Sequence, residues 1–224
     1  YTGDFIAVNK YAYGIRLPLV NTKVLDLGAP QHGDVVVFRY PENPKIYYIK
    51  RVIGVGGDTV SFNNGQLSVN GKAIATTPAN FTPDPKMTAQ LYPPGKTETG
   101  ELVTAEQAAQ LGNQEELSAK YVQESPSSNH QHLVRYLGDK NWFQYASFLQ
   151  QASPQLMVSQ GQQWQIKVPE GHYFVMGDNR DRSADGRFWG FVPDENLAGK
   201  AVYVWTHKAS GLSLPTFNRN GAIH

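Results

Sequence analysis

The sequence predicts a mainly β protein, in which a β-rich core of antiparallel sheets is interrupted by a large, loop-rich insertion domain. The first observation is a set of short runs rich in β-branched and aromatic residues near both ends of the chain, at residues 4–8, 35–38, 46–53, 164–168, 173–176 and 199–205. The second is the composition after about residue 72, where prolines at positions 78, 83, 85, 93 and 94 are typical of loops. We therefore expect a discontinuous core of residues 1–59 and 169–224, and an inserted second domain of residues 60–168.

Turn residues separate the N-terminal runs and so define the predicted strands. Gly33-Asp34 precedes the run 35–38, residues 41–45 form a turn by composition, and glycines end the run 46–53. The runs 59–62 and 66–69 flank Asn64-Gly65, a pair that supplies the positive φ angles of a tight turn. We therefore expect a β-hairpin there.

Helix signals occur only within the insertion. Thr104 and Gln107 have the spacing of a capping box, which predicts a short helix over residues 105–111. Asn113 with Glu116 is a candidate cap for a further turn. The apolar residues of 142–149 fit a helix or a strand, and both assignments stay open.

Composition excludes several classes of protein. The 224 residues contain 20 Lys and Arg against 19 Asp and Glu, so the net charge is +1 and the basic surface of a nucleic-acid binder is not expected. Without cysteine, the chain cannot form disulfides or thiolate metal sites. No apolar run has the roughly 18 residues that span a bilayer. Because the sequence does not open with a charged leader and an apolar stretch, we expect no signal peptide at its start.

Lys50 stands inside a strongly β-prone run, which is unusual for a cation. Strand alternation places Lys50 and Arg51 on opposite faces of that strand. Burial of the lysine would lower its pKa and make the neutral amine available as a base. The alternative is an ordinary lysine that reaches water from the end of a strand.

The densest cluster of charge follows the apolar run 173–176. Residues 178–187 contain three Asp and three Arg, and Gly177 precedes them. A solvated turn is one interpretation of such a composition. A calcium loop is not supported, because its twelfth position would be Val192 instead of glutamate. His130 and His132 also lack a third ligand at a recognisable spacing, so we expect no metal site.

Four blocks of sequence resemble the bacterial type I signal peptidases (leader peptidases), a family of Ser/Lys proteases. In chain order the blocks are Gly3-Asp4-Phe5, Gly33-Asp34-Val35-Val36-Val37-Phe38, Tyr48-Ile49-Lys50-Arg51 with Gly57-Asp58, and Gly177-Asp178-Asn179-Arg180-Asp181 continuing through Ser183-Ala184-Asp185, Arg187 and Trp189-Gly190. The order of the blocks is itself characteristic of the family. The resemblance is poor over residues 72–164, which carry none of the blocks, so we expect the chemical step not to depend on them.

The resemblance implies a role for each matched residue. Lys50 corresponds to the general base, and Ser183 to the hydroxyl that orients it. Further residues are implied to support the site or to line the pockets for small side chains. The supporting residues are Asp178, Asp185, Arg187 and Arg51, and the pocket residues are Ile6, Val37, Tyr48 and Ile49.

The family's nucleophilic serine lies upstream of the block matched by Gly3-Asp4, so we expect it outside the 224 residues and expect residues 1–224 alone to be inactive. The resemblance implies a serine endopeptidase that removes signal peptides of secreted preproteins at small-x-small sites. It also implies an inner-membrane protein with its catalytic domain on the periplasmic side, at the membrane surface, monomeric and without a cofactor. The alternative is a catalytically inactive β-rich domain that binds exported peptides.

Overall fold

The computed structural model describes residues 4–13, 15–16, 23–25, 27–85, 88, 91–92, 94–96, 102–137, 142–207 and 221–223. Its elements are mainly β, and every strand pairing between them is antiparallel. The predicted fold class is therefore confirmed. Gly3 and Pro93, which the sequence analysis named, lie outside the described residues.

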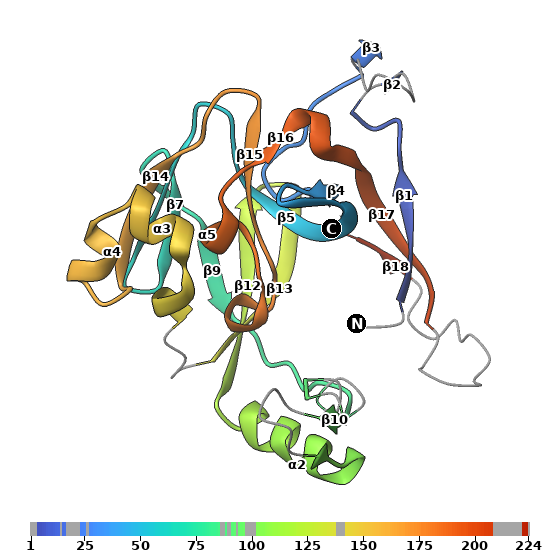
Figure 1. The fold of residues 1–224 in the computed structure, drawn as a ribbon, viewed down its shortest axis with the longest axis vertical. Helices are drawn as coiled ribbons and strands as arrows, with labels where there is room; N and C mark the ends of the chain where they lie inside the picture. Colours follow the sequence, from blue (N-terminus) through green and yellow to red (C-terminus); the bar gives the residue numbers. More distant parts are fainter. Residues whose placement is uncertain are drawn as a thin grey trace.

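The largest sheet joins the two ends of the chain. Its strands run in the order β1-β17-β4-β5-β15-β16, and β18 pairs with β17 (Figure 1). The bounds are β1 Asp4–Asn9, β4 Val35–Tyr40, β5 Asn43–Val55, β15 His172–Met176, β16 Val192–Pro193, β17 Leu197–His207 and β18 Gly221–Ala222. Five of these contain the runs that predicted strands; the turn expected at residues 41–45 ends earlier, because β5 begins at Asn43.

A four-stranded sheet in the order β14-β6-β7-β8 packs beside the largest one. Its strands are β6 Thr59–Asn63, β7 Gln66–Val69, β8 Lys72–Ala73 and β14 Gln163–Lys167. The predicted hairpin is confirmed, with φ of 46° at Asn64 and 90° at Gly65.

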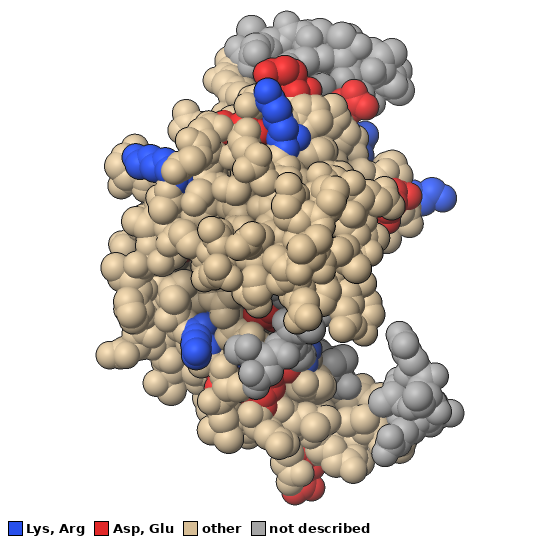
Figure 2. All heavy atoms as spheres, turned by 90° about the vertical axis from the view of Figure 1, so that its left-hand side faces the viewer, with Lys and Arg blue, Asp and Glu red and all other residues tan. Residues whose placement is uncertain are grey.

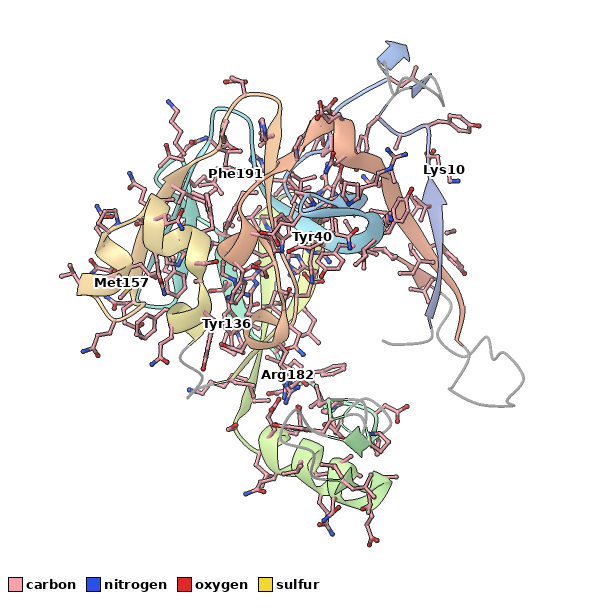
Figure 3. The ribbon with its side chains drawn as sticks, in the orientation of Figure 1. Lys10, Tyr40, Tyr136, Met157, Arg182 and Phe191 are labelled. Atoms are coloured by element: carbon pink, nitrogen blue, oxygen red, sulfur yellow. The ribbon has the colours of Figure 1, made fainter. Side chains whose placement is uncertain are left out.

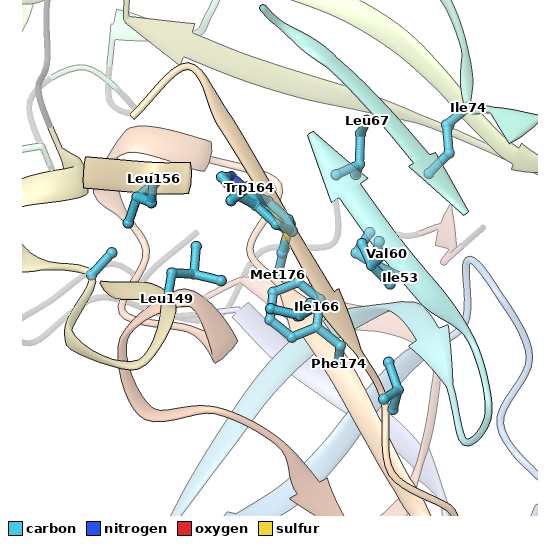
Figure 4. Close-up of a cluster of buried hydrophobic side chains, with 12 residues drawn as sticks. Ile53, Val60, Leu67, Ile74, Leu149, Leu156, Trp164, Ile166, Phe174 and Met176 are labelled. Atoms are coloured by element: carbon cyan, nitrogen blue, oxygen red, sulfur yellow. The ribbon is translucent and has the colours of Figure 1, made fainter. Parts of the chain in front are cut away.

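The main apolar cluster lies between the four-stranded sheet, the strands β5 and β15, and two short helices (Figure 4). Ile53, Phe174 and Met176 come from the proposed core, whereas Val60, Leu149 and Trp164, among others, come from the proposed insertion. Burial of such side chains is worth about 1.5–3 kcal/mol each. The two parts of the chain therefore share one hydrophobic interior. A second cluster, including Val36, Phe38, Val52 and Val175, packs on the largest sheet.

The remaining part of the insertion contains more regular structure than its prolines indicate. A three-stranded sheet runs β13-β12-β9, and α2 packs at its end (Figure 1). The bounds are β9 Ala75–Pro78, β10 Gly95–Lys96, β11 Leu102–Val103, α2 Ala105–Glu116, β12 Ala119–Ser127, β13 His130–Leu137, η1 Trp142–Tyr145, α3 Ser147–Ala152 and α4 Gln155–Val158. Near the N-terminus, β2 Ile15–Arg16 pairs with β3 Lys23–Leu25.

The helix expectations are partly met. The capping box of Thr104 and Gln107 is present, but α2 continues to Glu116, so the second cap proposed at Asn113 is wrong. The segment 142–149, for which the sequence leaves helix and strand as alternatives, is mainly helical: η1 covers residues 142–145 and α3 begins at residue 147. The face of the molecule over α3, α4 and β14 carries few charged side chains (Figure 2), in keeping with the absence of any charged residue from 141 to 166.

Candidate active site

Lys50 and Ser183 meet beside the C-terminal end of β15, although 133 residues separate them in sequence. Lys50 lies in β5, and Ser183 follows η2 (Arg180–Arg182) in the loop between β15 and α5 (Gly186–Trp189). Lys50 Nζ donates to Ser183 Oγ over 2.8 Å. Lys50 is half-buried and Ser183 is only 7% exposed, so the pair is partly shielded from water.

The surroundings of Lys50 disfavour its charged form. Burial lowers the pKa of Lys50 below its usual 10.5; Asp185 opposes the shift, Arg187 adds to it, and Asp178 opposes it. Because desolvation penalises a charged amine more than a neutral one, the net direction is toward a neutral amine. Nζ also lies 5.6 Å from the centre of the Tyr48 ring, on the same face of β5. The geometry places a candidate base next to a fixed hydroxyl.

Asp185 and Arg187 hold the loop that carries Ser183. Both side chains are at most 1% exposed, and Arg187 Nε and Nη2 donate to the two carboxylate oxygens of Asp185 over 2.8 and 2.9 Å. Asp185 also caps α5 and accepts from the Gly177 amide at 2.9 Å. Burial alone would raise the pKa of Asp185, but Arg187 and these hydrogen bonds lower it, so the carboxylate is ionised. One carboxylate thus connects the start of the loop to its end.

Gly177 packs directly against the Lys50–Ser183 pair. A Cβ at this position would overlap Ser183 Oγ, lie 2.5 Å from Ser183 Cβ and lie 3.6 Å from Lys50 Nζ. Contacts this short to a real Cβ do not occur without displacement of the neighbour. The close approach of the loop to Lys50 therefore requires glycine.

Arg51 points to the other face of β5, as strand alternation predicts. Its Nε and Nη2 donate to the carboxylate of Asp178 over 2.9 Å each, and its Nη1 donates to the Gly33 carbonyl at 2.7 Å. Arg51 is 4% exposed. Its hydrogen bonds connect β5 to the 177–183 loop and to the turn before β4, and they do not bring it to Ser183.

The four predicted pocket residues do not all share a face with Lys50. Val37 pairs with Ile49 in the register of β4 and β5, whereas Lys50 pairs with Val36 and Tyr48 with Phe38. Alternation thus places Tyr48 beside Lys50, and Val37 with the exposed Ile49 on the opposite face. Ile6 lies in β1, which β17 separates from β4. Their role in substrate binding stays a prediction.

Sequence reasoning missed a buried centre around Asp34. Its carboxylate accepts from Tyr13 Oη at 3.1 Å, lies 3.1 Å from His130 Nε2 and pairs with Lys200 Nζ. Burial and the adjacent Asp34 raise the pKa of Tyr13. Because these partners are 21, 96 and 166 residues from Asp34, no local motif could have indicated them.

Among the described residues, no group of three or more His, Asp and Glu side chains is arranged to hold a metal ion. His130 is bonded to Ser127 and Asp34, and His132 lies 3.2 Å from Glu124, so the two histidines have separate surroundings. Within the same described parts of the chain, no helix combines the length and hydrophobicity that a membrane crossing requires.

Comparison with known proteins gives consistent matches over nearly the whole chain. The family model described as "Signal peptidase, peptidase S26" matches residues 1–206. The chain is 40% identical to signal peptidase I of Pseudomonas aeruginosa, with 99% of this chain and 66% of that protein aligned. The corresponding figures are 39%, 99% and 66% for signal peptidase I of Pseudomonas fluorescens, and 34%, 99% and 71% for that of Buchnera aphidicola subsp. Baizongia pistaciae.

The chain spans about two thirds of the length of these relatives. A solved signal peptidase I from Enterococcus faecalis V583 aligns with 77% of this chain and 97% of that chain, at 24% identity and a TM-score of 0.36.

Proposed function

Because the chain belongs to the signal peptidase family, peptidase S26, we propose that it is the catalytic part of a serine endopeptidase that removes N-terminal signal peptides from secreted preproteins. The observation that carries the proposal is the contact of Lys50 Nζ with Ser183 Oγ, in surroundings that lower the lysine pKa. A lysine whose pKa is lowered is better suited to general base catalysis, because a larger fraction of it is the neutral amine at a given pH.

In the proposed reaction, Lys50 acts on a serine supplied from a segment N-terminal to Tyr1. The neutral amine takes the proton of that serine hydroxyl while the serine oxygen attacks the scissile carbonyl. The ammonium then returns a proton to the leaving amine as the peptide C–N bond breaks, which leaves an acyl-enzyme. Water then attacks the acyl carbon and gives a proton to Lys50. The resulting ammonium passes this proton to the serine oxygen as the acyl C–O bond breaks, which restores the serine hydroxyl and the neutral amine.

Ser183 is proposed as the orienting residue, not as the nucleophile. Its oxygen accepts a hydrogen bond from Lys50 Nζ and so fixes the direction of the amine. Asp185, Arg187, Asp178 and Arg51 are proposed to support the two elements that bring the pair together. No cofactor is required by this scheme.

The proposed substrate is an extended segment with small side chains at alternate positions, as in signal-peptide cleavage sites. Ile6, Val37, Tyr48 and Ile49 are proposed to line its pockets. The proposed setting is the periplasmic side of the inner membrane, at the membrane surface, with the enzyme acting as a monomer.

The test is cleavage of a secreted preprotein by the full-length protein and by Lys50→Met. This change keeps the length and apolar packing of the side chain, so we expect loss of at least ~10²-fold in kcat with the fold retained. Lys45→Met, an exposed lysine of the same strand, is the matched control and should cleave normally. Residues 1–224 alone should show no turnover.

Substantial activity of a folded Lys50→Met protein would show that the Ser/Lys mechanism is wrong. Peptide binding without cleavage by the full-length protein would instead support the inactive peptide-binding domain.

A further inference from the structure

A buried carboxylate of the inserted sheet is paired with the loop that carries Ser183. Glu124 lies in β12 and is fully buried, and Arg180 lies in η2 and is 2% exposed. Arg180 Nη1 donates to Glu124 Oε1 over 3.0 Å, and Arg180 Nη2 donates to Glu124 Oε2. The Tyr136 hydroxyl, from β13, also accepts from Arg180 Nη1 at 2.7 Å. Tyr136 lies where the inserted hairpin reaches the loop (Figure 3).

Arg180 also forms hydrogen bonds with the loop that carries Ser183. Its Nε donates to the Gly177 carbonyl at 3.2 Å, and its own carbonyl accepts from Arg187 Nη2. Gly177 is the residue whose Cβ, if present, would overlap Ser183 and lie 3.6 Å from Lys50 Nζ. Three successive contacts therefore connect the inserted sheet to the candidate catalytic pair: Glu124 with Arg180, Arg180 with Gly177, and Gly177 with Ser183.

The carboxylate of Glu124 is ionised in this setting. Burial by itself raises its pKa, but Arg180 and His132 lower it to about 2. His132 Nε2 lies 3.2 Å from Oε2, on the opposite strand of the hairpin. A fully buried ion pair of this kind is weak evidence for stability, because apolar residues of similar size often serve as well. Its presence therefore calls for another role.

The backbone of the hairpin supports the same loop. The Arg135 amide donates to the Asp178 carbonyl at 2.9 Å, and the Leu137 amide donates to the Asp181 carboxylate at 2.7 Å. These bonds hold residues 178–181 against β13. Arg180 is the residue of this stretch whose guanidinium reaches back to Gly177.

We propose that Glu124 is a positioning residue for the Lys50–Ser183 pair. It fixes the Arg180 side chain, and Arg180 in turn fixes the Gly177 carbonyl, so that Gly177 keeps the two catalytic side chains in place. The proposal rests on the function proposed above. It assigns a part in the chemical step to the inserted segment, in contrast to the expectation from the sequence. Lys50 is in the core and Glu124 in the insertion, so the active geometry depends on both.

The decisive variant replaces both members of the pair, Glu124→Met with Arg180→Met, in the full-length protein. Removing both charges leaves no unpaired buried ion, so the protein should fold with a Tm within a few degrees of the wild type. The Gly177 carbonyl loses its donor, and we expect kcat to fall about ten-fold or more, which is part of the ~10²–10⁴-fold that general base catalysis supplies. KM should change by less than about two-fold. Leu156→Ala, at a fully buried position of α4 in the insertion, is the control and should lower Tm without lowering kcat.

A double-mutant cycle with Ser183→Ala distinguishes positioning from a general structural role. If Glu124 acts through Ser183, the paired Met changes should have little further effect on kcat once the Ser183 hydroxyl is gone. An equal loss in both backgrounds would overturn the proposal, as would an unchanged kcat in a folded double variant. If the double variant does not fold, Glu124→Asp decides, because it keeps the charge and withdraws the carboxylate by one methylene; normal kcat there overturns the proposal. Failure of the proposed function would appear differently, as retained activity in Lys50→Met.

Discussion

At the scale of single residues, the proposed mechanism requires glycine at position 177, because a side chain there would clash with the catalytic pair. The close packing of Gly177, Ser183 and Lys50 leaves no room for a Cβ between them. We predict that Gly177→Ala displaces the Ser183 hydroxyl from Lys50 Nζ and lowers kcat by about ten-fold or more in the full-length protein. The measurement is kcat with Tm alongside. Because Gly65 is open to solvent and has a positive φ, Gly65→Ala is a control that should affect stability alone.

The protonation of Lys50 makes a second prediction at this scale. Burial lowers the pKa of Lys50 from 10.5, and only the neutral amine can accept the proton of the nucleophile. The neutral fraction grows as pH rises through the lowered pKa, so kcat/KM should rise with pH and level off at a lower pH than an ordinary lysine with a pKa of 10.5 would give. The measurement is kcat/KM of the full-length protein as a function of pH, up to pH 10.5. A profile without a rising limb would contradict the assignment of Lys50 as base.

The residues of the proposed site were predictable to different degrees. Lys50, Ser183, Asp185 and Arg187 stand in short motifs, and the structure brings these four side chains together; their catalytic roles stay predictions. Glu124 carries no motif and lies 56 residues from its partner Arg180, so only the folded structure could reveal the contact. The partners of Asp34 are also distant in sequence, so they too could be found only in the folded structure.

At the scale of elements, local signals predicted where structure begins better than where it ends. The capping box fixed the start of α2, because Thr104 and Gln107 satisfy each other's backbone amides. The end was missed because Asn113 acts within the helix, where its side chain accepts from the Thr88 hydroxyl at 2.8 Å. Tertiary contact there overrides the tendency of Asn to cap.

The cap of α2 gives a prediction at this scale. Thr104→Ala removes the acceptor of the Gln107 amide, and loss of such a cap costs about 1 kcal/mol. Amide exchange in the first turn of α2 should therefore become faster. We expect kcat to stay unchanged, because Thr104 lies at the opposite end of α2 from Glu115, which accepts hydrogen bonds from Arg182 beside Ser183. Thr104→Ser is the matched control, since it keeps the hydroxyl. A fall in kcat would mean that α2 is coupled to the site.

At the scale of the whole molecule, the proposed division at residues 59/60 and 168/169 passes through one apolar cluster. Ile53 and Val60 lie on either side of the first boundary, and Trp164 and Phe174 on either side of the second, with ring centres 5.9 Å apart. Composition along the chain marks where loops begin. It does not show which buried faces are shared, because that depends on how sheets pack after folding. The proposed boundaries therefore separate stretches of different composition. Whether the two parts also fold separately has to be measured.

The shared cluster predicts that residues 1–224 unfold in a single cooperative transition. Two domains with separate interiors would unfold independently, whereas parts that bury the same side chains lose stability together. Leu156→Ala, in α4 of the insertion, removes a fully buried side chain of this cluster and should cost roughly 2–5 kcal/mol. If the cluster joins both parts, that change lowers the unfolding temperature seen by fluorescence and that seen by amide exchange in β5 to the same extent. Loss of stability confined to residues 60–168, with β5 unaffected, would instead show that the core folds by itself and that the insertion is an independent unit.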